Sequence, residues 1–139
     1  MRCPIGDTGE GEQAMKAIYL NVNENQLPEV IDIPDELKTY YKLCQCTCID
    51  IVTRHIGKTP YSIVCDDEGL FVASPKISAV DETYQPQLVG NLVICGMPND
   101  DGELTALTDR DLFNILPRIR FLHTTTHPDG YYILTISKP

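Results

Sequence analysis

The chain has 139 residues, which is enough for one domain with a substantial buried core, so disulfide bonds are not needed to hold it together. Its 20 acidic and 11 basic residues give a formal net charge of −9 at pH 7, which argues against direct binding of nucleic acid or of an anionic membrane surface. The same charge permits a basic partner, although a plain acidic domain is the simpler interpretation.

The six cysteines could frame disulfide bonds in a small secreted protein. However, Cys65 and Cys95 lie inside apolar strand-like runs, where a reduced thiol packs as a small hydrophobic group. The sequence opens without an apolar signal segment, and no run is long enough to cross a bilayer. We therefore expect a cytoplasmic protein with reduced thiols and no membrane contact.

The first residues differ in composition from the rest of the chain. Residues 1–14 combine glycines with polar and acidic residues and lack apolar periodicity, so we expect a flexible leader. Residues 15–139 should form a single domain, and both Met1 and Met15 remain candidates for the physiological start.

The ordered part begins with two predicted strands, at 17–22 and 29–33, on either side of a turn. A helix should then begin at Pro34, with Asp35 and Glu36 favourably placed at the positive end of its dipole. This helix should pack on the sheet through a stripe at helical spacing, formed by Leu37, Tyr40, Tyr41 and Cys44.

A β-hairpin is the strongest structural signal in the sequence. Two runs rich in β-branched and aromatic residues, 49–55 and 61–65, flank a break at Gly57 and Pro60. The spacing predicts a hairpin with a loop of medium length.

The remaining elements are, in chain order, a strand at 70–73, a long connection at 74–87, a central strand at 88–95, a helix from an N-cap at Thr108 to Leu116, and strands at 119–124 and 131–137. Together these elements predict an α+β fold. We expect a mostly antiparallel, twisted sheet with one or two short helices packed on it and a C-terminal β-hairpin.

The turn end of the hairpin is the main cationic spot, and it contains Arg54, His55, Gly57 and Lys58. The glycine could offer backbone N–H groups, and Arg54 with Lys58 could clamp a phosphate or carboxylate. His55 should point to the opposite face of the strand from Arg54, which limits how many of these residues can meet one ligand. The alternative is a solvated hairpin end whose charges balance local acids.

Acidic residues gather in two turns and are candidates for a partner-binding patch, which would comprise Asp66, Asp67, Glu68, Asp100 and Asp101. Neither turn places an acid at the first position of a calcium-binding loop, so we interpret both as turns between strands.

Two groups of residues could suggest a metal site. Cys44, Cys46 and Cys48 would line one face of an extended backbone, but the second half of a zinc site is missing. His123 and His127 have a helical spacing, yet the Thr-rich segment between them should not form a helix. We therefore predict no metal and no other cofactor, and leave open whether the cysteine cluster binds metal.

With these residues in view, the chain resembles a family of small phage and mobile-element proteins, domain-of-unknown-function family 3846, over about residues 15–116. The resemblance rests on five blocks: C-I-D-I at 48–51, R-H-I-G-K at 54–58, Y-S-I-V-C-D-D-E-G-L at 61–70, V-G-N-L-V-I-C at 89–95 and L-T-A-L-T-D-R-D at 104–111. The family has no established catalytic residues, and its genomic context implies an action on host defence.

The sequence contains no nucleophile elbow and no phosphate-cradling loop, so we expect a protein that is not an enzyme. The leading hypothesis is a counter-defence binder that blocks a host immune component, of CRISPR or restriction type, through an acidic surface. One alternative is a sponge that sequesters an anionic nucleotide signal through Arg54 and Lys58, in a pocket that could lie at a homo-oligomer interface. A second alternative is a metal-stabilised interaction domain.

Overall fold

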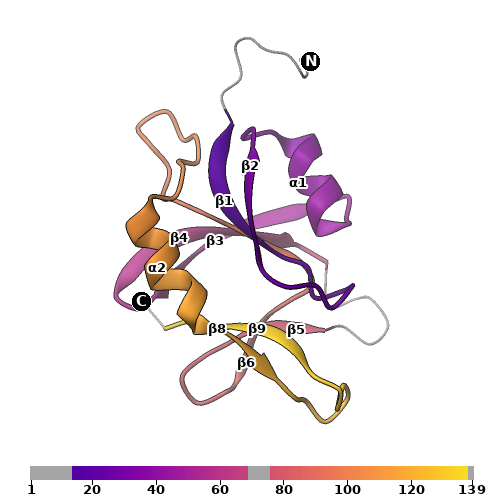
Figure 1. The fold of residues 1–139 in the computed structure, drawn as a ribbon. Helices are drawn as coiled ribbons and strands as arrows, with labels where there is room; N and C mark the ends of the chain where they lie inside the picture. The colour runs from indigo at the N-terminus through magenta and orange to yellow at the C-terminus, as the bar shows by residue number, and fades with distance from the viewer. Residues whose placement is uncertain (1–13, 69–75, 138–139) are drawn as a thin grey trace.

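The structure is a computed structural model that describes residues 14–68 and 76–137. The predicted leader, apart from Ala14, and the predicted strand at 70–73 lie outside the described residues. The predicted α+β class is confirmed, as are the mostly antiparallel pairing, the two short helices and the C-terminal hairpin (Figure 1).

The described strands form two sheets, whereas a single sheet was expected. The first has the order β2-β1-β7-β4-β3 and is antiparallel throughout: β1 (Met15–Leu20), β2 (Glu29–Ile33), β3 (Ile49–Ile56), β4 (Thr59–Asp66) and β7 (Leu92–Cys95). The second has the order β6-β5-β9-β8: β5 (Ile77–Val80), β6 (Pro86–Val89), β8 (Ile119–Leu122) and β9 (Tyr131–Thr135). In it β5 and β9 run parallel.

Two apolar cores hold these layers together. The larger lies between the two sheets and is closed at one side by helix α2 (Asp109–Ile115); it includes Ile18, Ile63, Ile94, Ile115 and Leu134. The smaller lies between the other face of the first sheet and helix α1 (Leu37–Cys44); it includes Tyr19, Tyr40, Cys44, Val64 and Val93. The central strands β1, β7 and β4 are therefore largely buried, whereas the edge strands β2 and β3 have several exposed residues. Figure 1 shows α1 beside the first sheet and the second sheet below it.

The predicted hairpin is present as β3 and β4, with a tighter turn than expected. Ile56 pairs with Thr59, so only Gly57 and Lys58 form the turn, and Pro60 belongs to β4. Gly57 has a φ of 66°, a conformation that two-residue hairpin turns require and that glycine adopts without strain.

The prediction of a single central strand at 88–95 is wrong. The chain divides this run between β6 and β7, which belong to different sheets. Gly90, with a φ of 78°, and the buried Asn91 lie at the change of direction. The predicted long connection at 74–87 is also partly wrong, because it contains β5 and the start of β6. A short strand with a proline at an edge gives little local signal.

Helix α1 begins three residues later than predicted, at Leu37, with Glu36 as its N-cap. Asp35 accepts hydrogen bonds from the Tyr40 hydroxyl (2.5 Å) and from the backbone N–H of Leu104 (3.0 Å). Asp35 therefore lies before the helix, where it connects α1 through Tyr40 with the loop that precedes α2 through Leu104. Tyr40 and Cys44 pack on the sheet as predicted, whereas Leu37 remains 60% exposed.

Candidate functional site

The structure does not bring the predicted cationic residues together. Arg54 lies on the same face of β3 as Val52, which packs against the larger core, and it lines a cleft between the two sheets. His55 lies on the alternate face of the strand, as predicted, and its carbonyl accepts a hydrogen bond from the backbone N–H of Ser137 (2.7 Å). Lys58 is exposed in the turn and does not line that cleft.

Gly57 has a structural role, which the sequence could not reveal. A Cβ atom placed on Gly57 would lie 2.7 Å from Asn114 Oδ1 and 3.1 Å from Arg118 Cζ, so the turn packs directly against α2 and the residues that follow it. Asn114 donates a hydrogen bond to the Ile56 carbonyl (2.8 Å), and Arg118 donates to the carbonyl of Asn114 (2.7 Å). The hairpin turn is therefore an anchor for α2.

The predicted acidic patch divides into two groups. Asp66 ends β4 beside Gly90, where an added Cβ would lie 4.0 Å from the Cβ of Asp66. Asp100 and Asp101 lie beyond the other end of β7, in a loop closed by the bridge between Gly96 and Thr105. Because β7 has four residues, it separates the two groups by about 13 Å. The predicted acidic residues are therefore two separate groups and do not form one contiguous cluster.

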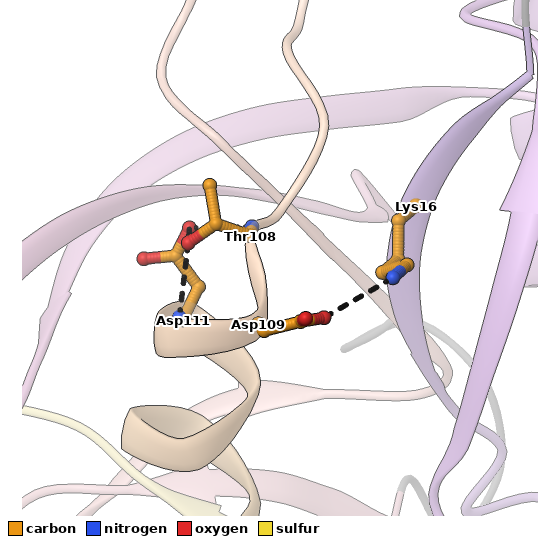
Figure 2. A network of polar contacts seen from close by, with 4 residues as sticks. All are labelled: Lys16, Thr108, Asp109 and Asp111. Atoms are coloured by element: carbon orange, nitrogen blue, oxygen red, sulfur yellow. Dashed lines mark hydrogen bonds and ion pairs between the residues drawn. The ribbon is translucent and has the colours of Figure 1, made fainter.

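The N-terminus of α2 is fixed by a capping box, as the sequence predicted. The Thr108 hydroxyl accepts a hydrogen bond from the backbone N–H of Asp111 (3.2 Å), and the Asp111 carboxylate accepts one from the backbone N–H of Thr108 (2.8 Å). Figure 2 shows this pair together with the ion pair between Lys16 and Asp109 (3.4 Å), which ties α2 to β1. The other Asp111 oxygen accepts a hydrogen bond from the Tyr61 hydroxyl (2.8 Å).

Burial acts to raise the pKa of Asp111, but hydrogen bonds from Thr108 and Tyr61 outweigh it and lower the pKa below its ordinary value of 3.8. A lowered carboxyl pKa adds stability above the unfolded value, and that stability is lost as pH falls through the folded value. Replacing Asp111 by alanine should lower the free energy of unfolding at neutral pH by about 1–2 kcal/mol.

Urea unfolding of this variant at several pH values checks the prediction. Its stability should depend less on pH below about 4 than that of the wild type. Asp109→Ala is the matched control, because its exposed ion pair should contribute less than about 1 kcal/mol. Equal losses in the two variants would contradict the role assigned to the capping box.

One face of α2 carries an exposed phenylalanine, Phe113, beside Leu112 and Leu116, which are partly buried against the larger core. Asp109, Leu112 and Phe113 of α2, with Leu116 and Pro117 of the 3₁₀ turn that follows it (Leu116–Arg118), line a groove of about 560 Å³. Their spacing is that of one helical face. Phe113 is 81% exposed, the largest value among the exposed large hydrophobic residues of the described chain. The opposite face carries the fully buried Ile115. We call the five residues of the groove the α2 stripe.

Acidic residues stand at the N-terminal end of the α2 stripe. The loop that precedes the helix carries Asp100, Asp101 and Glu103, all exposed, and in Figure 1 it rises beyond that end of α2. Asp35 joins this loop through its hydrogen bond with the N–H of Leu104. Among the described residues, Lys16 with Asp109 is the only ion pair of this region, so most of these carboxylates lack a cation.

The sequence contains a signal for the α2 stripe. The helix predicted from Thr108 to Leu116 contains the apolar residues Leu112, Phe113, Ile115 and Leu116. On a helix, however, Ile115 lies away from Phe113 by about 200°, so a single buried face cannot hold both. The two-residue offset is the signal that α2 has apolar residues on more than one side.

The cysteine cluster does not form the expected row on one face. Cys44 ends α1 and is buried, Cys46 is partly buried in the turn that follows, and Cys48 is exposed just before β3. Within residues 14–68 and 76–137, no group of three or more His, Cys, Asp or Glu side chains is arranged to hold a metal ion. His123 and His127 instead make local hydrogen bonds in the β8–β9 loop, to Pro128 and Thr126.

Burial raises the pKa of the Cys65 and Cys95 thiols to about 12 and also raises that of Cys44. Because the thiolate is the reactive form, these three residues should resist alkylation by iodoacetamide in the folded protein near neutral pH. Among the cysteines of the described residues, the exposed Cys48 should be alkylated first. Site-by-site mass spectrometry before and after unfolding checks this order, and rapid native labelling of Cys95 would contradict it.

Comparison with known proteins supports the resemblance noted from the sequence blocks. No helix within the described residues has the length and hydropathy needed to cross a bilayer. No curated protein and no solved structure matches the chain. A family model does match residues 15–118, and this range includes the first sheet, both helices and the α2 stripe. The chain therefore belongs to the family described as "Domain of unknown function (DUF3846)".

Proposed function

We propose that this protein acts by non-covalent binding, as a counter-defence protein that covers a basic surface of a host immune protein. The observation that carries the proposal is the α2 stripe, with Phe113 81% exposed in a groove of about 560 Å³. Large exposed apolar surfaces on a folded domain are typical of sites that bind another molecule.

The stripe offers an apolar anchor for such a complex. Burying a phenylalanine side chain from water stabilises a complex by about 1.5–3 kcal/mol. Phe113 already sits in a groove with Leu112 and Leu116, so an apolar side chain of a partner could enter between them. Exposed aromatic residues beside a pocket are the type of residue that dominates interface energetics.

The negative charge of the protein favours a partner with a basic binding surface. Asp100, Asp101 and Glu103 lie in the loop beyond the N-terminal end of α2 (Figure 1), with no ion pair among the described residues, and the whole chain carries a net charge of −9. A second copy of the chain would bring like charges together, which is unfavourable. A segment with an apolar residue flanked by Lys or Arg would satisfy both the groove and the carboxylates. Surfaces that bind nucleic acid have this basic character.

An interference assay in cells tests the proposal. Bacteria carrying a CRISPR or a restriction system are challenged with phage, with and without expression of this protein. We expect the wild type to restore phage growth, Phe113→Ser to lose the effect and Phe121→Ser to keep it. Phe121 is a matched control because it is also an aromatic residue with 50% exposure, but it lies on β8. No effect of the wild type on any defence system would contradict the proposal.

The nucleotide sponge stays a prediction, and no feature of the described residues favours it. Arg54 shares its cleft with the carboxylates of Asp50, Asp66 and Asp67, which would repel an anionic ligand. Lys58 lies outside that cleft. Titration with cyclic nucleotides and ADP-ribose is the test.

A further inference from the structure

A second cleft, separate from the α2 stripe, opens where the two sheets diverge. It has a volume of about 320 Å³ and lies between the edge strand β3 of the first sheet and the edge strand β6 of the second. Val52 and Leu88 form part of its apolar wall, and both also pack against the larger core. The volume lies at the lower end of the range for small-molecule sites.

The cleft carries charges of both signs that are not paired with each other. Arg54 donates a hydrogen bond to the neighbouring carbonyl of Thr53 (2.9 Å), and no ion pair joins it to Asp50, Asp66 or Asp67 within the described residues. Unpaired charges that face one cleft attract complementary groups more strongly than charges that already neutralise one another.

The thiol of Cys65 lies in the same cleft and is affected by all of these charges. Burial is the main reason that its pKa is raised to about 12, but Asp50, Asp66 and Asp67 also raise it while Arg54 acts in the opposite direction. The four charged groups therefore lie close enough to one sulfur atom to influence its ionisation.

We propose that this cleft binds a small zwitterion of the aliphatic α-amino acid type. The ammonium group would face the Asp carboxylates, the ligand carboxylate would face the Arg54 guanidinium, and the aliphatic side chain would lie against Val52 and Leu88. A ligand with only an anionic group would meet three carboxylates and one guanidinium, and a ligand with only a cationic group would leave Arg54 unsatisfied.

Three matched compounds separate these possibilities. L-leucine carries both charges, 3-methylbutylamine lacks the carboxylate, and 4-methylpentanoate lacks the ammonium group. In titrations followed by amide chemical shifts, leucine should bind with a dissociation constant of about 1 mM or tighter and perturb β3 and β6. The amine should bind about tenfold more weakly, and neither 4-methylpentanoate nor ADP-ribose should bind.

Substitutions in the cleft test which side chain binds which charged group of the ligand. Arg54→Gln should lower the affinity for leucine to that of the amine while leaving the amine unaffected, whereas Asp50→Asn should weaken both. Arg120→Gln, on the exposed face of β8, is the matched control and should change neither. The proposal is overturned if the amine, 4-methylpentanoate or ADP-ribose binds as tightly as leucine, or if no compound binds at about 10 mM. It is also overturned if Arg54→Gln leaves leucine binding unchanged.

Discussion

Replacing Ile94 by alanine should lower the free energy of unfolding by about 2–5 kcal/mol, a large part of the stability of a domain of this size. Ile94 has no exposed surface and lies in β7 between Ile18 of β1 and Ile63 of β4. Its side chain faces the larger core, where the second sheet covers it. Removing it would leave a cavity that neighbours fixed in two sheets cannot readily fill.

Urea denaturation measures this loss as a lower midpoint with little change in slope. Ile51→Ala makes the same substitution on the edge strand β3, where the side chain is 46% exposed, and should cost less than about 1 kcal/mol. If the two variants lost equal stability, the placement of the main core between the sheets would be wrong.

Replacing Phe113 by serine should have its largest effect on binding. Because the side chain is 81% exposed, its loss should change the free energy of unfolding by no more than about 0.5 kcal/mol. Burial of a phenylalanine in a complex contributes about 1.5–3 kcal/mol, so the affinity for a partner should fall by about 10- to 100-fold. The substitution leaves the charge of the protein unchanged, so any loss reports on the apolar anchor.

A synthetic amphipathic helix of leucine and lysine is a defined probe for this variant. Calorimetry should show that the wild type binds this peptide, more weakly at higher salt, and does not bind a leucine and glutamate counterpart. Phe121→Ser should bind like the wild type. Equal affinities of the Phe113 and Phe121 variants would place the binding surface elsewhere.

The parts of the fold that could be predicted are those with local signals. The β3–β4 hairpin follows from two β-branched runs around Gly57, and the start of α2 follows from the Thr108 and Asp111 capping box. The division of 88–95 between two sheets has no comparable local signal, because β6 and β7 pair with strands that are distant in the sequence. A run of apolar residues has the same pattern whether it forms one strand or contributes to two sheets.

The sites were harder to predict for the same reason. Alternation along β3 correctly separated Arg54 from His55, but the cleft beside Arg54 exists only because β6 comes to lie near β3. The two acidic turns are both present, yet β7 holds them at opposite ends of the first sheet. Phe113 could be recognised as a surface residue only once Ile115 was known to take the buried side of α2.

Photo-crosslinking from the α2 stripe tests the central claim most directly. Benzoylphenylalanine is introduced at position 113 or, as a control, at position 121, in cells whose defence system the protein is found to inhibit. We predict that position 113 forms a covalent adduct with a nucleic-acid-binding protein of that system and that position 121 does not. An adduct from position 121 alone, or none from position 113 while inhibition persists, would contradict the assignment of α2 as the docking surface.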